Sequence, residues 1–254
     1  MDGKAFRMPK VVASIEARMG SSRLPGKVLM DINGESAIKR EVDRIRQCRH
    51  VDDIVLATTL EPIDDELVVW AKSQNLKYYR GSENDVLARV ISAHRMMHTD
   101  VIVELTGDCP LLDHKIVDLG IASFLANDYD VVTNVRIPSY PQGADVQVFS
   151  FEQLADVERT IFDDAVREHV SLHFYENSDL YDICDLIAPE FIRAPDVRLQ
   201  LDYPEDLEFI RKVYSILEPI HGPLFGVESI LQLLDQRSDI GAINSHCIEK
   251  PVRS

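Results

Sequence analysis

The chain has 254 residues, of which 45% are hydrophobic and 28% charged, the balance of a folded soluble protein. Its 27 Lys and Arg against 43 Asp and Glu give a net charge of −16. This charge excludes a general binder of nucleic acid or of anionic membranes, because their phosphates would be repelled. A site for an anionic substrate must therefore be a local basic pocket or must use a metal ion.

The cysteines and the N-terminus indicate a cellular compartment. Cys48, Cys109, Cys184 and Cys247 form no CxxC pair and have no zinc-type spacing with histidine, so we expect neither a disulfide framework nor a structural zinc. Residues 1–10 lack the apolar stretch of a signal peptide, and no apolar run approaches the ~18 residues of a membrane span. A cytoplasmic protein without membrane association is predicted.

The first half of the chain alternates short apolar runs with stretches of helical periodicity. The apolar runs predict buried parallel strands at 11–15, 54–57, 101–105 and 130–132. Helical periodicity predicts helices around 38–45, 64–71 and 86–93, and acidic residues Asp64, Asp65 and Glu66 suit the start of the second. This alternation predicts an α/β fold with a doubly wound sheet.

The second half begins with a different pattern. Residues 140–143 predict a turn, and alternation at 146–149 and 181–186 predicts two strands, with a helix over 163–175 between them. No linker is visible, so we expect one domain over 9–254, with a strand-rich insertion at about 136–197 that continues the same sheet. Later helices are expected at 204–217, opened by Pro204, and at 227–234.

The loop 17–27 directly follows the first predicted strand and is the most informative segment. It contains two glycines, two serines and three cations, which are Gly20, Gly26, Ser21, Ser22, Arg18, Arg23 and Lys27. Glycines let backbone N–H groups approach phosphate oxygens, and Arg and Lys neutralise them. The spacing is not that of a Walker A motif, because five residues separate the glycines and Val28 follows Lys27. The loop indicates a polyphosphate pocket, and a solvated basic loop is the alternative.

Two carboxylates end other predicted strands. Asp108 follows Gly107 after the third strand, and Asp202 follows the alternating Leu199 and Leu201. Mg²⁺ usually takes one or two protein carboxylates together with phosphates and waters. A turn aspartate is the alternative for Asp108, and a helix N-cap is the alternative for Asp202. Together with the basic loop, these residues predict Mg²⁺-dependent chemistry on a nucleoside triphosphate.

These segments resemble the signature of the spore-coat-polysaccharide cytidylyltransferase family, relatives of the CMP-Kdo and CMP-acylneuraminate synthetases. The matching segments lie in order within about residues 10–217, at 18–27, 80–87, 106–110, 167–170 and 202–207. The family usually has Thr where this chain has Tyr203, and often Gln where it has Glu16. The first departure puts the shape of the local pocket in doubt. The second places a carboxylate near the triphosphate loop, which is unfavourable unless it turns away or meets a cation.

The resemblance implies a Rossmann-like nucleotidyltransferase sheet with a strand-rich dimerisation insertion, and an enzyme that transfers CMP from CTP and releases pyrophosphate. Lys27, Arg18 and Asp108 would be catalytic, and Asp108 and Asp202 would hold Mg²⁺ as the cofactor. The implied nucleotide-binding residues are Ala17, Arg18, Gly20, Ser21, Ser22, Arg23, Lys27, Arg80, Ser82 and Asp108.

The implied acceptor is small and anionic, a 2-keto-3-deoxy sugar acid or a phosphorylated polyol or sugar used for surface polysaccharide or glycan synthesis. The residues expected to bind it are Tyr140, Gln142, Asp145, Gln147, Arg167, Glu168 and His169. His169 in a dimer contact and an Arg167–Asp163 pair are the alternatives. We expect a homodimer that binds no nucleic acid. Cys109 is interpreted as a small packed residue.

Three other functions stay open at this stage. A nucleotidyltransferase with another donor, such as GTP, would share the same loop. A glycosyltransferase-like module that binds a nucleotide sugar would be expected to carry Asp-x-Asp, where this chain has Gly107, Asp108 and Cys109. A regulatory nucleotide-binding protein without chemistry is disfavoured by the retained Lys27, Asp108 and Asp202.

Overall fold

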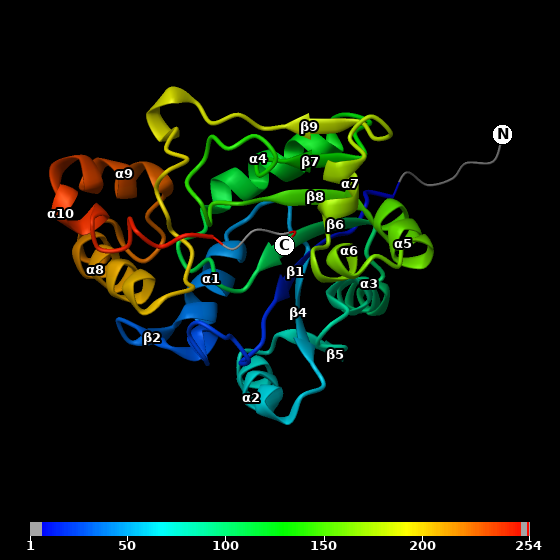
Figure 1. Cartoon of the computed structure of the whole chain (residues 1–254), viewed down its shortest axis with the longest axis horizontal. Helices are drawn as coiled ribbons and strands as arrows, with labels where there is room; N and C mark the ends of the chain where they lie inside the picture. The colour runs from blue at the N-terminus through cyan, green and yellow to red at the C-terminus, as the bar shows by residue number, and fades with distance from the viewer. Residues whose placement is uncertain (1–6, 250–252, 254) are drawn as a thin grey trace.

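A seven-stranded sheet runs through the centre of the protein, whose computed structural model describes residues 7–249 and 253. The strand order is β5-β4-β1-β6-β8-β7-β9 (Figure 1). The strands are β1 (Val11–Glu16), β4 (Asp53–Thr59), β5 (Lys77–Gly81), β6 (Val101–Thr106), β7 (Val131–Thr133), β8 (Gln147–Ser150) and β9 (Ile183–Asp185). A separate two-stranded ribbon joins β2 (Asp31–Ile32) to β3 (Glu35–Ser36). All four strands predicted in the first half are present, and β5 is an addition.

The strands β1, β4, β5 and β6 pair in parallel, which was predicted for β1, β4 and β6, whereas β7 was predicted to be parallel and is so on one side only. β1 pairs in parallel with β4 and β6, and β4 with β5. β8 runs antiparallel between β6 and β7, and β7 pairs in parallel with β9. β7 therefore has one antiparallel neighbour, because the later strand β8 inserts between it and β6.

Helices cover both faces of the sheet. They are α1 (Ala37–Ile45), α2 (Asp65–Ser73), α3 (Val86–Met97), α4 (His114–Leu125), α5 (Phe151–Thr160), α6 (Asp164–Glu168), α7 (Leu172–Glu176), α8 (Pro204–His221), α9 (Val227–Gln236) and α10 (Ser238–Gly241). Successive residues of β1 point to opposite faces. Ala13 and Ile15 join the core beneath α1, α2, α4 and α8, whereas Val12 packs with Ala93 and Met97 of α3. This period of two explains the continuous apolar runs in the sequence.

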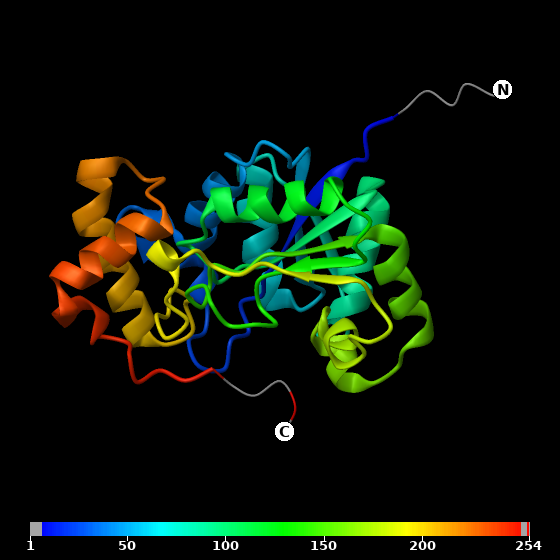
Figure 2. The same ribbon diagram turned by 90° about the horizontal axis from the view of Figure 1, so that it is seen from above.

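The segment 136–197 extends the same sheet, as predicted, but it is not strand-rich. Its regular structure is mostly helical, in α5, α6 and α7, and Figures 1 and 2 show these helices at the end of the molecule away from α8–α10. The helix predicted over 163–175 is divided into α6 and α7, because His169 has extended backbone angles of φ −115° and ψ 98°. The helix α5 was not predicted from the sequence.

The ends of β1 and β6 lie side by side, and Glu16 is in register with Thr106. The backbone N–H of Gly107 donates a 2.8 Å hydrogen bond to the carbonyl of Glu16. A side chain at position 107 would place its Cβ 2.8 Å from the Cβ of Ala17, so the two loops approach this closely only because residue 107 is glycine. The loops that carry Lys27 and Asp108 therefore start from one junction.

Among the described residues, the longest helix is too polar to cross a lipid bilayer, and the shorter helices lack the length.

Candidate active site

A cavity of about 570 Å³ opens at the carboxyl ends of β1 and β6. In open α/β sheets this edge is where ligands bind. Its lining residues come from the loop after β1, from α3, from the loop after β6, and from α6 and the chain before α8. They include Ala17, Arg18, Ser21, Ser22, Arg23, Lys27, Arg89, Asp108, Glu168, His169, Gln200 and Asp202. The structure therefore brings the basic loop together with both predicted metal carboxylates.

Lys27 lines this cavity between the two predicted metal carboxylates. Its Nζ lies 2.6 Å from Asp108 Oδ2 and 2.8 Å from Asp202 Oδ1. Burial would lower the pKa of Lys27, but the two carboxylates outweigh it and raise that pKa, so the ammonium stays charged. Lys27 itself is 9% exposed and belongs to a short 3-10 helix over Lys27–Leu29, which follows Gly26 at φ 72°. Glycine tolerates this left-handed conformation, and the turn places Lys27 between the two strand ends.

Asp202 is surrounded by cations. Arg23 Nη2 and Arg198 Nη2 each lie 2.6 Å from one of its oxygens. Burial by itself would raise the pKa of Asp202, but Lys27 and Arg23 lower it to about 2. Asp202 is therefore ionised at neutral pH.

The segment before α8 differs from its prediction in two respects. Residues 199–201 are extended and hydrogen-bonded to Gln142 and Asp108, but they form no strand of the sheet. Asp202 does not cap α8. Asp206, three residues after the N-cap position Tyr203, accepts the backbone N–H groups of Asp202 and Tyr203 instead. This arrangement frees the Asp202 carboxylate to face the cavity.

The carboxylates of Asp108 and Asp202 fit a magnesium ion in the type of ligand atom that they offer and in the direction in which they point. Both offer hard oxygen ligands, and both already converge on a single cationic atom, Lys27 Nζ. Two protein carboxylates are the number that Mg²⁺ usually takes when phosphates and waters complete its coordination. Such a site requires that the ammonium of Lys27 turns from the carboxylates toward the phosphates.

Two guanidinium groups at the cavity carry buried donors without partners among the described residues. They are Arg23 Nη1 and Arg89 Nε. A buried donor that lacks an acceptor costs about 1–3 kcal/mol, so such groups indicate a ligand that supplies one. Phosphate oxygens are acceptors of the required charge.

The basic loop is held by a buried carboxylate, Asp64, which is 1% exposed. The backbone N–H of Met19 donates a 2.6 Å hydrogen bond to Asp64 Oδ1, and the hydroxyl of Thr59 donates to Oδ2. The backbone N–H of Gly26 closes the loop onto the carbonyl of Met19 at 2.9 Å. The prediction for Asp64 was a helix start, and the residue does precede α2, but its side chain supports the loop.

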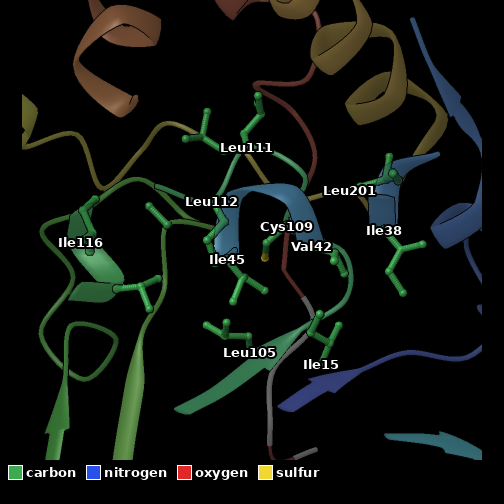
Figure 3. Close-up of a cluster of buried hydrophobic side chains, with 14 of the residues drawn as sticks. Ile15, Ile38, Val42, Ile45, Leu105, Cys109, Leu111, Leu112, Ile116 and Leu201 are labelled. Atoms are coloured by element: carbon green, nitrogen blue, oxygen red, sulfur yellow. The ribbon is translucent and has the colours of Figure 1, made fainter. Parts of the chain in front are cut away.

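The loop after β6 is fixed from two sides. The backbone N–H of Cys109 donates to Glu41 Oε2 at 3.2 Å, and Gln200 Nε2 donates to Asp108 Oδ2 at 3.3 Å. Cys109 is buried among Val42, Ile45 and Leu105 (Figure 3). Burial raises the pKa of the Cys109 thiol far above its usual value, which agrees with the prediction of a packed residue.

Several predicted nucleotide-binding residues lie outside the cavity lining. Arg80 donates to the carbonyls of Thr59 and Glu61 and pairs with Asp65 at 2.6 Å. The hydroxyl of Ser82 accepts the backbone N–H of Asp85 at 3.1 Å. Gly20 is exposed and absent from the lining.

The predicted acceptor residues divide into two groups. Tyr140 and Gln142 lie outside the lining, where Gln142 accepts from Arg198, and Arg167 pairs with Asp85 at 2.6 Å rather than with Asp163. The other four line a second cavity of about 280 Å³ that shares residues with the first. They are Asp145, Gln147, Glu168 and His169.

Three charged residues that line the two cavities were not assigned by the sequence. Arg89 is a cation at a buried position of α3, and it follows the matched segment 80–87. Glu104 occupies a buried position in the apolar strand β6 and lines the second cavity. Glu249 lines both cavities from the C-terminal segment. For Arg89 and Glu104, the sequence carries a signal, because each is a charged residue inside an apolar pattern. For Glu249, the sequence carries no such signal.

Comparison with known proteins identifies the family. The family model described as cytidylyltransferase matches residues 12–249. The spore coat polysaccharide biosynthesis protein SpsF of Bacillus subtilis is 33% identical over 239 residues, which cover 91% of this chain and 97% of that protein.

Solved structures confirm the predicted Rossmann-like nucleotidyltransferase fold. A cytidylyltransferase from Leptospira borgpetersenii superposes with a TM-score of 0.88 at 28% identity, covering 96% of this chain and all (100%) of that chain. A CMP:2-keto-3-deoxy-manno-octonic acid synthetase complexed with CTP has a TM-score of 0.60 at 20% identity and covers 81% of this chain and 98% of its own. The chain belongs to the cytidylyltransferase family and is a nucleotidyltransferase.

Proposed function

We propose that this protein transfers CMP from CTP to a small acceptor in an Mg²⁺-dependent reaction that releases pyrophosphate. The observation that carries the proposal is the cluster around Lys27, where two carboxylates converge on one ammonium beside guanidinium groups with unpartnered donors. The cavity is lined by four cations, Arg18, Arg23, Lys27 and Arg89, alongside five carboxylates, in a protein of net charge −16. Guanidinium and ammonium groups gathered in this way suit the phosphates of a triphosphate.

The cations have distinct proposed roles. Arg18 is 41% exposed and pairs with Glu83, so it can leave this exposed pair for a phosphate at low cost. Arg23 and Arg89 supply the unpartnered donors. Lys27 stabilises the charge that develops at the α-phosphate and the leaving pyrophosphate, because its ammonium lies beside both predicted metal carboxylates.

Asp108 and Asp202 are the residues that would hold Mg²⁺. When bound, the ion supplies charge neutralisation on the phosphate oxygens. The chain positions the reactants: the junction at Gly107 fixes the distance between the Lys27 loop and the Asp108 loop, and Arg198 and Gln200 orient the carboxylates. An acceptor oxygen attacks the α-phosphorus in line, and no protein nucleophile is required.

The acceptor reaches the reaction centre from the second cavity in this proposal, since that cavity shares Thr106, Gln200 and His169 with the first. A sugar acid or a phosphorylated polyol, used for surface polysaccharide or glycan synthesis, provides a suitable oxygen. A cytoplasmic homodimer with one domain over 9–254 completes the proposal. The name of the Bacillus subtilis relative supports the polysaccharide role.

Thermal unfolding with Mg²⁺ and CTP, UTP, GTP or ATP tests the nucleotide. A ligand at a hundredfold excess over its dissociation constant stabilises the native state by about 2.7 kcal/mol. CTP is expected to raise the melting temperature more than the other three. An equal shift with all four, or a selective shift with GTP, would contradict the proposed donor.

A further inference from the structure

The second cavity is lined by acidic side chains and, unlike the first, by no cation among the described residues. Its lining holds five carboxylates, which are Glu16, Glu104, Asp145, Glu168 and Glu249. Among the described residues, neither Lys nor Arg lines this cavity, and none of the five carboxylates is in an ion pair. Arg89 of the first cavity offsets part of the charge of Glu16, whereas Glu104 and Asp145 are influenced by neighbouring carboxylates.

Two of these carboxylates come from neighbouring strands. Glu16 ends β1 and Glu104 lies in β6, and the register pairs Glu104 with Ser14, two residues before Glu16 on the same face. Glu104 is 4% exposed and accepts a hydrogen bond from Gln147 Nε2. Glu16 Oε1 is inaccessible to water and has no hydrogen-bond partner among the described residues. This oxygen is a buried acceptor without a donor, beside the cavity that Glu16 lines.

Holding this charge without a ligand is unfavourable. Burial and then Asp145 raise the pKa of Glu104 to about 7, and burial with Glu249 and Asp108 raises the pKa of Asp145 to about 7. Buried carboxylates without a counter-charge are costly, and a bound cation would remove the cost. A sulfate, phosphate or carboxylate in this cavity would increase it.

Hydroxyl groups alone would satisfy some of the carboxylate oxygens, as in many sugar sites. They would leave the excess negative charge in place, however, whereas an ammonium group would provide both hydrogen-bond donors and a counter-charge. The number of unpaired carboxylates therefore favours an ammonium group over a neutral polyol.

We infer that the end of the acceptor that enters the acidic cavity carries an amino group, which makes the substrate class an amino sugar or aminated polyol. This inference rests on the proposed function, because the reacting oxygen has to lie at the other end of the molecule, near Lys27 and Asp108. Any acidic group of the acceptor then lies at that reacting end, among the cations. The acceptor is zwitterionic in this case, which replaces the wholly anionic acceptor expected from the sequence.

Three linear polyols with one skeleton provide the test: glucamine, sorbitol and gluconate carry an ammonium, a hydroxyl and a carboxylate. Each is titrated calorimetrically into the protein with and without CTP and Mg²⁺. Glucamine is expected to bind at least about tenfold more tightly than sorbitol, since a tenfold change corresponds to only 1.4 kcal/mol. Gluconate is expected to bind most weakly.

The variant Glu104→Gln with Asp145→Asn should lose the glucamine preference and keep its CTP affinity. Glu66→Gln with Asp128→Asn, both exposed, is the matched control and should keep the preference. If the double variant fails to fold, the variant Glu168→Gln takes its place, because Glu168 is exposed. This variant should reduce the preference for glucamine two- to threefold.

Equal or tighter binding of sorbitol or gluconate would overturn the inference, as would no binding of any of the three while CTP binds. A failure of CTP to bind while glucamine is preferred would overturn the proposed function alone.

Discussion

Two adjoining cavities at the ends of β1 and β6 differ in where their cations lie. The first, the cationic cavity, is lined by Arg18, Arg23, Lys27 and Arg89 together with five carboxylates, and the second, the acidic cavity, is lined by five carboxylates without a Lys or Arg among the described residues. The two cavities share three of these carboxylates, Glu16, Glu168 and Glu249, so the difference comes from the loop after β1 and from α3, which supply cations to the first cavity alone. In the proposed reaction, this difference places the phosphates of CTP on one side and the hydrogen-bond donors of the acceptor on the other.

Removal of Lys27 is expected to have the largest effect on the cationic side. Lys27→Met should lower turnover by about 10³-fold, because it removes the ammonium that contacts both Asp108 and Asp202 and that stabilises the charge at the α-phosphate in the proposed reaction. Pyrophosphate release measures the rate. Lys115→Met, an exposed lysine on α4, is the control and should keep normal turnover. A near-normal rate for Lys27→Met would remove Lys27 from the mechanism.

Neutralising Asp108 should affect the metal more than the nucleotide. Asp108→Asn is expected to reduce turnover by about 10²-fold and to raise the Mg²⁺ concentration needed for half-maximal activity, because one carboxylate ligand is lost. A magnesium titration of the rate measures both effects. An unchanged titration midpoint would show that Asp108 does not hold the ion.

A methyl group added at residue 107 tests how closely the loops after β1 and β6 must approach each other. Gly107→Ala places a Cβ 2.8 Å from Ala17 Cβ and 3.1 Å from the Glu16 carbonyl. We expect a loss of about 1–3 kcal/mol in the free energy of unfolding, measured by urea denaturation. Gly20→Ala is the control, since its Cβ would meet only Glu83 Oε1 at 3.5 Å. Equal stability of the two variants would contradict the tight junction.

The acidic cavity should make stability depend on pH. The pKa of Glu104 is raised from 4.5 to about 7 and that of Asp145 from 3.8 to about 7, so the native state binds more protons than the unfolded state between these values. The free energy of unfolding should therefore fall as pH rises from about 4 to 7.

Unfolding of the apo protein at several pH values tests this dependence, and Glu104→Gln with Asp145→Asn should flatten it. An equally steep profile in that variant would assign the effect to other groups.

The sequence predicted β1, β4 and β6 because each contains a run of mostly apolar residues, and it missed β5, whose residues Lys77–Gly81 carry no such run. It predicted Lys27, Asp108 and Asp202 of the cationic cavity because the loop that carries Lys27 follows one predicted strand and the two aspartates end others. The roles of Asp64 and Glu41 were beyond it, since both act on loops that are distant in the chain, Asp64 on Met19 and Glu41 on Cys109.

The acidic cavity could not be predicted in the same way. Glu104 and Glu16 meet only because β1 and β6 are neighbours, and Asp145 and Glu249 come from segments that carry no periodic pattern. The helical character of 136–197 was missed because its three helices are short and separated by breaks such as that at His169.

The most direct measurement is a crystal structure of the protein with CTP and Mg²⁺. The account predicts the triphosphate in the cationic cavity, the metal ion on Asp108 and Asp202, and Lys27 Nζ within hydrogen-bonding distance of an α-phosphate oxygen. A triphosphate bound elsewhere, or Lys27 still held between the two carboxylates with CTP present, would contradict it.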